Sequence, residues 1–139
     1  MDLSFMKKFK PETRCIKEFT YWIVCIRPKQ VTIGDAVILL KRETSSLGGV
    51  LPKEAEELPE VFKWYEDICV NKFGAVKFNY TVAMMHDNFV HYHAFPRYDK
   101  IIELFGQVWE DVEWPALVSF RNVPVDEDIL QQIKNYMNS

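Results

Sequence analysis

The stretch from Val90 to Arg97 reads VHYHAFPR and places His91 and His93 two positions apart in an aromatic and apolar run. Such a run predicts a β-strand, in which successive side chains point to opposite faces of the sheet. The two imidazoles are therefore expected on one face, roughly 6–7 Å apart. One phosphate group could touch both of them.

The residues just before this run predict its partner strand. Asn79 to Met85 (NYTVAMM) forms a second strand-like stretch, and His86-Asp87-Asn88 between the two is a plausible tight turn. Further upstream, apolar residues recur at helical spacing between Pro52 and Gly74, a residue suited to ending a helix. Pro59 interrupts this pattern, so the helix either kinks there or begins anew after a short first turn.

A second hairpin is expected near the N-terminus. Phe19 to Arg27 (FTYWIVCIR) and Asp35 to Lys41 (DAVILLK) both read as strands, and Pro28 ends the first because it has no N–H for a ladder. A C-terminal helix is predicted from Ile129, Leu130, Ile133 and Met137 on one face. Strands in hairpins joined by a helix predict an α+β fold: an antiparallel sheet of about five strands with two main helices.

Length and composition set outer limits on organisation and function. The 139 residues suit a single domain, 1–139, and the net charge of −3 argues against a general nucleic-acid binder. The first ten residues lack the apolar core of a secretory signal, and no run is long enough to cross a bilayer. Three widely spaced cysteines without a C-x-x-C pair favour reduced thiols in a cytoplasmic protein.

Three functional interpretations of the histidines stand side by side. A neutral imidazole is a nucleophile near pH 7, its neighbour can donate a hydrogen bond to a phosphoryl oxygen, and Arg97 could bind further phosphates. Alternatively, His86, His91 and His93 supply three ligands to a metal ion. The remaining possibility is two half-exposed histidines on a sheet face with no function.

The run HYHAFPRY, after NYTVAMM and an apolar helix, resembles the signature of the histidine triad (HIT) family. In its dinucleoside polyphosphate hydrolase branch, the last histidine is often followed by Pro-Arg. The stretch TIGDAVILLKR (32–42) resembles the glycine-led second strand of the family, so the similarity covers residues 19–98.

The resemblance implies a mechanism and a set of contacts. His91 falls at the middle histidine, the nucleophile of the family, which attacks the α-phosphorus of a nucleotide and forms a nucleotidyl-histidine. His93 falls at the third histidine and would hydrogen-bond a phosphoryl oxygen. Asn79, His86 and Lys41 are candidate contacts to the substrate. For Lys41, a solvated strand end is an equally good interpretation.

Two positions depart from the family pattern. Phe89 stands at the first histidine of the triad, and Asp35 stands where many members carry a supporting histidine. A non-catalytic nucleotide-binding or interaction protein with the same fold is therefore the alternative to an enzyme. The resemblance further implies a nucleotide or dinucleoside polyphosphate substrate, such as diadenosine tetraphosphate, and a homodimer. It implies no required cofactor and leaves Mg²⁺ open.

Overall fold

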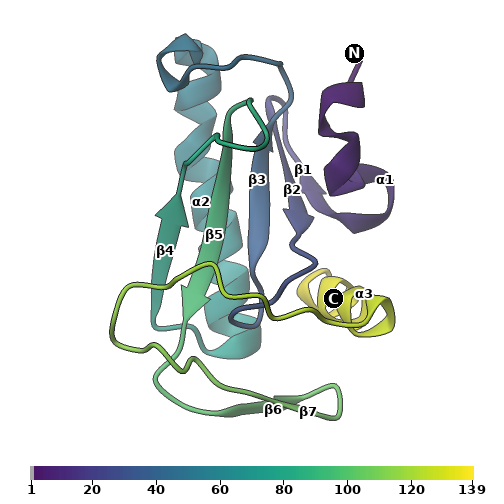
Figure 1. The fold of residues 1–139 in the computed structure, drawn as a ribbon, viewed down its shortest axis with the longest axis vertical. Helices are drawn as coiled ribbons and strands as arrows, with labels where there is room; N and C mark the ends of the chain where they lie inside the picture. The colour runs from purple at the N-terminus through teal and green to yellow at the C-terminus, as the bar shows by residue number, and fades with distance from the viewer. Residues whose placement is uncertain (1) are drawn as a thin grey trace.

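A computed structural model describes residues 2–139 and has one main sheet of five antiparallel strands (Figure 1). The order across the sheet is β1-β2-β3-β5-β4. These strands span Cys15–Glu18 (β1), Trp22–Ile26 (β2), Ala36–Leu40 (β3), Lys77–Thr81 (β4) and His91–Arg97 (β5). The helices span Ser4–Phe9 (η1), Pro11–Arg14 (α1), Leu47–Gly49 (η2), Pro52–Phe73 (α2) and Glu127–Met137 (α3). The predicted α+β fold with its antiparallel sheet is confirmed.

Both predicted hairpins form. β2 pairs with β3, β4 pairs with β5, and β3 and β5 join the two hairpins in the centre of the sheet. Every residue of β2 and β3 is buried, because the sheet is covered on both faces. The connection between β4 and β5 runs from residue 82 to residue 90, longer than the predicted three-residue turn.

Helix α2 is continuous from Pro52 to Phe73 and does not begin anew at Pro59. Pro59 leaves one backbone carbonyl without its helical donor, but Val61, Tyr65, Cys69 and Phe73 bury one face of the helix against the sheet. Packing of this apolar face outweighs the local loss at the proline. Gly74 ends the helix with a φ of 78°, as expected for a glycine after the last turn.

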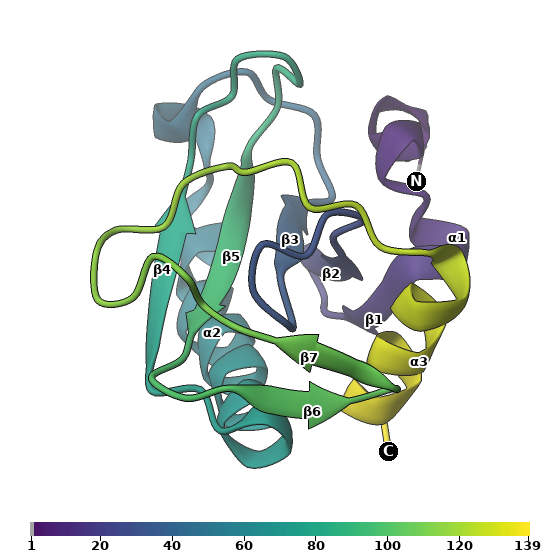
Figure 2. The same cartoon turned by 60° about the horizontal axis from the view of Figure 1, so that its bottom comes forward.

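The two faces of the sheet are covered differently. Helices α2 and α3 pack on the face that carries Tyr92 and Ala94. On the other face, η1 packs against Cys25, Leu39 and Phe89, among others. The segment 110–125, here called the strap, crosses in front of β4 and β5 on its way to α3 (Figure 2).

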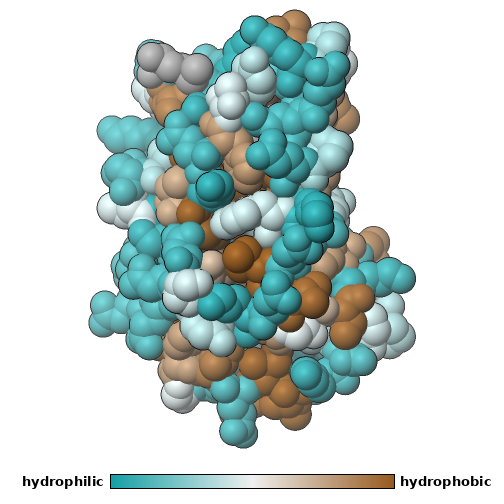
Figure 3. Space-filling view, turned by 180° about the vertical axis from the view of Figure 1, so that it is seen from behind, coloured by the Kyte–Doolittle hydropathy of each residue, from teal (hydrophilic) through white to brown (hydrophobic). Residues whose placement is uncertain are grey.

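The chain also contains elements that the sequence did not reveal. The N-terminal residues form η1, α1 and the edge strand β1, and a small hairpin of β6 (Ile102–Leu104) and β7 (Gln107–Trp109) precedes the strap. Seen from the α2 side, the surface is largely hydrophilic, with apolar patches concentrated in its lower half (Figure 3). Among residues 2–139, no helix has the length and apolar character needed to cross a membrane.

Candidate functional site

The two histidines of β5 lie side by side, on the sheet face opposite α2. His91 is opposite Leu39 and His93 is opposite Val37 in the ladder between β3 and β5. Their ring centroids are 5.1 Å apart, closer than the spacing expected from an ideal strand. The prediction that both imidazoles share one face is therefore confirmed.

His91 is held in one orientation and is covered. Its Nδ1 lies 2.7 Å from the carbonyl oxygen of Phe89, and the side chain is only 3% exposed. Since a carbonyl only accepts hydrogen bonds, Nδ1 carries the proton and Nε2 keeps its lone pair. Phe9 of η1 lies over the imidazole with ring centroids 5.5 Å apart. Lys8, next to it, forms an ion pair with Asp87 at 2.9 Å.

His93 is half-buried and lines a pocket of about 190 Å³. Burial is the main reason why its pKa is lowered to about 4, with the neighbouring His91 and Arg27 acting in the same direction. The imidazole of His93 is therefore neutral at pH 7. Phe120 of the strap packs edge-on against this ring at 5.0 Å and forms part of its cover.

Basic side chains dominate the pocket beside His93. Lys8, Arg14, Arg27 and Lys29 line it, and Asp87 is the single carboxylate among its lining residues. These side chains come from η1, from the end of α1 and from the chain just after β2. The fold thus gathers four cations from three segments next to one of the two histidines.

Arg97 does not line this pocket, and its role as a phosphate contact stays a prediction. Its side chain is 2% exposed, and its Nε and one terminal nitrogen donate to the two carboxylate oxygens of Asp111 at 2.7 and 3.0 Å. The other terminal nitrogen donates to the side-chain oxygen of Asn79 and to the carbonyl of Ala116. Arg97 therefore fastens the strap to β5.

Asn79 serves the same structural connection. Its side-chain oxygen also accepts a hydrogen bond from the backbone N–H of Val118 in the strap, at 3.3 Å. Its amide nitrogen donates to the carbonyl of Phe78. The polar atoms of Asn79 are thus engaged within the protein, and its contact to substrate stays a prediction.

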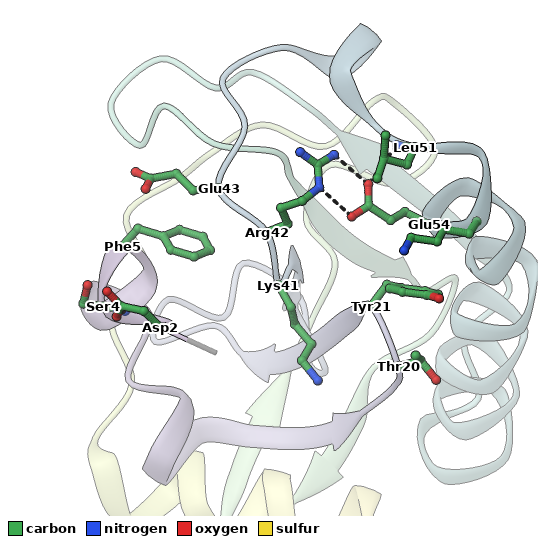
Figure 4. A pocket seen from close by; sticks show the side chains of 11 residues that line it. Asp2, Ser4, Phe5, Thr20, Tyr21, Lys41, Arg42, Glu43, Leu51 and Glu54 are labelled. Carbon is green, nitrogen blue, oxygen red and sulfur yellow. Dashed lines mark hydrogen bonds and ion pairs between the residues drawn. The ribbon is translucent and has the colours of Figure 1, made fainter.

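Lys41 directly follows the last residue of β3. Its amine donates to Glu18 and to the carbonyl of Phe19, near the β1 edge. It lines a pocket of about 420 Å³ with Arg42 and Glu54, and Figure 4 shows the paired contacts of Arg42 with Glu54. This pocket contains neither His91 nor His93, and its Arg42 and Glu54 already form an ion pair with each other. The smaller basic pocket is the better candidate site.

His86 does not join the other two histidines in a metal site. It lies exposed in the connection between β4 and β5. In the described part of the chain, no three His, Cys, Asp or Glu side chains lie close enough to hold a metal ion. The metal-binding interpretation therefore finds no ligand set in this arrangement.

The two departures from the histidine triad pattern both have structural roles. Phe89 contacts Phe5 and Phe9 with ring centroids 5.0 and 5.8 Å apart, so it anchors η1 over the site. Asp35 is fully buried, and its carboxylate accepts hydrogen bonds from the hydroxyl and backbone N–H of Thr32. Burial raises the pKa of Asp35 to about 7, against the opposing effect of these hydrogen bonds.

The cover over His91 makes a prediction about its reactivity. Phe9→Ala removes the ring above the imidazole, so we expect His91 to be modified by diethyl pyrocarbonate at least about tenfold faster than in the wild type. Peptide mass spectrometry assigns the modified histidine, and exposed His86 serves as the internal standard. Phe19→Ala, which removes a ring packed on Trp64, is the matched control. An unchanged rate at His91 would show that η1 does not limit access.

The lowered pKa of His93 makes a prediction about stability. An unfolded chain binds a proton at this histidine near pH 6.5, whereas the folded protein does so only near pH 4. Falling pH therefore favours unfolding across this window, by up to about 3 kcal/mol. Buried Asp35 acts in the opposite direction, because its raised pKa favours the folded state as pH falls from about 7.

Comparison with His93→Asn separates the two effects. The free energy of unfolding of the wild type should fall relative to that of His93→Asn between pH 6.5 and pH 4. Urea titrations at several pH values measure this difference, with His86→Asn as the control for a histidine outside the pocket. Parallel profiles for wild type and His93→Asn would show that His93 is not a buried neutral base.

The basic residues of the pocket are the part of the site that the sequence did not reveal. Arg14 lies in an N-terminal region without a clear pattern, and Lys8 looks like one of several solvated lysines. Arg27 and Lys29 flank Pro28 at the end of a predicted strand. A strand end followed by a turn places both beside the same sheet face, which was the available signal.

Comparison with known proteins bears on the fold. No protein-family model matches the chain, and no curated protein matches it by sequence. Among solved structures, a histidine triad protein from Marinobacter aquaeolei aligns with a TM-score of 0.72 and 15% identity, covering 94% of this chain and 90% of the other. One from Sinorhizobium meliloti gives 0.72 and 13%, covering 94% and 91%.

A diadenosine triphosphate hydrolase from Plasmodium falciparum also aligns, with a TM-score of 0.68 and 12% identity over 91% of this chain and 75% of the other. At identities this low, the structural similarity establishes the fold of the chain, and the chemistry has to be argued from the residues of the site. Several independent alignments cover nearly the whole chain with the same architecture. The protein therefore has the histidine triad fold.

Proposed function

We propose that the protein is a nucleotide hydrolase or nucleotidyl transferase that cleaves at an α-phosphate, with His91 as the nucleophile. The observation that carries this proposal is the hydrogen bond between Nδ1 of His91 and the carbonyl of Phe89, at 2.7 Å. It fixes the tautomer in which Nε2 has a free lone pair, as a nucleophilic imidazole requires. A neutral second imidazole, His93, lies next to it.

The proposed reaction has two displacement steps. Nε2 of His91 forms a bond to the α-phosphorus, the bond from phosphorus to the leaving group breaks, and its electron pair departs with the leaving group. Water then cleaves the N–P bond, releases the nucleoside monophosphate and restores the neutral imidazole. His93 donates an N–H to a phosphoryl oxygen as negative charge develops there.

Access to His91 requires a change at η1, because Phe9 and Phe89 cover the imidazole. Displacement of a short segment that packs through a few aromatic contacts is a common way for a site to open. The same cover favours the second candidate function, a nucleotide-binding or interaction protein that keeps the fold without turnover. In that case His91 is a core histidine and the pocket beside His93 only binds.

A single-turnover experiment decides between the two functions. The wild-type protein is incubated with diadenosine tetraphosphate and, separately, with an adenosine phosphoramidate, and AMP and an acid-labile adduct are sought by intact-mass spectrometry. The enzyme proposal expects an adduct with the mass of one nucleotidyl group and release of AMP. Folded protein that binds nucleotide and gives neither product nor adduct would support the non-catalytic function.

We further propose that the protein acts in the cytoplasm as a homodimer and requires no cofactor. The three cysteines, Cys15, Cys25 and Cys69, are free thiols. Strands β1 and β4 are the edges of the main sheet, and pairing with a second copy would protect an edge from other contacts. Light scattering tests the dimer, and assays with added Mg²⁺ or with a chelator test the need for a metal ion.

A further inference from the structure

The charge around the pocket beside His93 is opposite to that of the whole chain. The protein carries a net charge of −3, yet this pocket is lined by four cationic side chains and one carboxylate. The carboxylate, Asp87, already pairs with Lys8 at 2.9 Å. Like charges brought together repel one another, so such a cluster is stabilised by an anion placed among them.

Two residues of the pocket lining each carry a buried nitrogen that lacks a partner. Within residues 2–139, Nε of Arg14 and Nδ1 of His93 are the buried side-chain nitrogens or oxygens without a hydrogen bond. Both residues line this one pocket. Buried polar groups in folded proteins are normally satisfied, so two unsatisfied nitrogens on residues around one small pocket favour a ligand there.

The guanidinium of Arg27 is fixed beside the same pocket. It lies over the rings of Phe95 and Phe120, 5.3 Å from each centroid, and one terminal nitrogen donates to the carbonyl of Lys29. A carboxylate oxygen of Asp35 lies 4.0 Å from it. A guanidinium packed against two aromatic rings is preorganised to bind an anion and loses little freedom on doing so.

Arg14 approaches the pocket from α1. One terminal nitrogen donates to Glu127 at 3.2 Å, and that glutamate is half-exposed, so water screens this contact. The remaining donors of Arg14 include the unpartnered Nε. Arg14 and Arg27 thus offer two forked cations to one ligand, the geometry that suits a phosphate group better than a single carboxylate.

We propose that this pocket binds a phosphate group of the substrate other than the one attacked by His91, with Arg14 and Arg27 as the specificity-determining residues. The inference rests on the proposed function because it takes the ligand to be a nucleotide. The positive charge and the unpartnered nitrogens are properties of the pocket and do not depend on that function. The substrate class is then a nucleotide with at least two phosphate groups. A nucleoside phosphoramidate with a single phosphate would leave the pocket unfilled.

Pyrophosphate tests the pocket without any chemistry at His91. Isothermal titration should show binding to the wild type that weakens from about 0.05 to about 0.2 M salt. Arg14→Gln and Arg27→Gln should each weaken binding by roughly tenfold, since each removes a charge-assisted contact. In the NMR spectrum, pyrophosphate should raise the pKa of His93, because an anion beside the imidazole favours its charged form.

Controls separate a built site from a general effect of charge. Lys63→Gln removes an exposed cation on α2 that pairs with Asp67, and it should leave pyrophosphate binding unchanged. Arg14→Lys, which keeps the charge, should restore part of the affinity. The proposal is overturned if pyrophosphate does not bind, or if Lys63→Gln weakens binding as much as Arg14→Gln does.

Two nucleotides then locate the second phosphate. ATP carries its additional phosphates in the chain, and adenosine 3′,5′-bisphosphate carries one on the ribose. The nucleotide whose affinity falls with Arg14→Gln, relative to AMP, is the one that reaches the pocket. Equal losses for AMP and both larger nucleotides would instead place the attacked phosphate itself in the pocket and overturn the proposal.

Failure of this proposal is distinguishable from failure of the proposed function. Pyrophosphate binding that depends on Arg14, in a protein that forms no nucleotidyl adduct, would support the phosphate-binding pocket and contradict the proposed enzymatic function. An adduct formed on a protein that does not bind pyrophosphate would support the proposed enzymatic function and contradict the phosphate-binding pocket.

Discussion

Asp111→Ala is expected to lower the free energy of unfolding by about 3–5 kcal/mol. The carboxylate accepts hydrogen bonds from two nitrogens of Arg97 and from the backbone N–H of Tyr98. Both side chains of this ion pair are 2% exposed, so removal of the carboxylate leaves an uncompensated charge inside the protein. Urea denaturation monitored by tryptophan fluorescence measures the loss.

A surface ion pair supplies the control for this prediction. Asp67→Ala breaks the contact with Lys63, whose side chain is 77% exposed, and we expect a loss below about 1 kcal/mol. The double variant with Arg97→Met and Asp111→Leu should recover much of the stability, because it buries no charge. If Asp111→Ala costs no more than Asp67→Ala, Arg97 is free to move, and its predicted role as a phosphate contact regains support.

His91→Ala is expected to abolish the nucleotidyl adduct and to lower turnover by at least about 10³-fold, because removal of a nucleophile eliminates the covalent route. His93→Ala should have a different signature. It removes one hydrogen-bond donor to the developing charge, so we expect a loss of about 10²–10³-fold in kcat with the adduct still formed on His91. Single-turnover kinetics with quantified adduct separates the two variants.

Circular dichroism and urea denaturation show that each variant is folded, which matters because His91 is buried in the aromatic cluster under η1. His86→Ala, in the exposed connection between β4 and β5, is the matched control and should keep wild-type turnover. Turnover that survives His91→Ala would remove the nucleophile from the proposal. An adduct that moves to His93 would reverse the two roles.

Local pattern in the sequence was sufficient for most of the sheet and for the pairing of the histidines. The run VHYHAFPR has period-2 character, so its two histidines had to share a face once it formed a strand. Pro28 and Gly34 predicted where the connection between β2 and β3 begins and ends, and the helical spacing after Pro52 predicted the position of α2. Each of these features depends on neighbours a few residues away.

Contacts between distant segments decided which side chains cover and surround the two histidines. No local sequence pattern predicts these contacts. Phe9 covers His91 from a segment more than eighty positions earlier in the chain, and Asp111 in the strap takes up Arg97. Arg14 reaches the pocket of His93 from α1. Such contacts form when covering segments bury the open face of the sheet. The free energy of this burial depends on residues far apart in the chain, so the spacing of neighbouring residues does not report it.

The sequence by itself thus determined an antiparallel α+β fold with His91 and His93 adjacent on β5. Only the tertiary structure decided which charged groups surround them. It buried Arg97 against Asp111 and brought Arg27 and Lys29 to His93. The physical reason is that strand geometry fixes the direction of a side chain, whereas its environment depends on which distant segment packs over it.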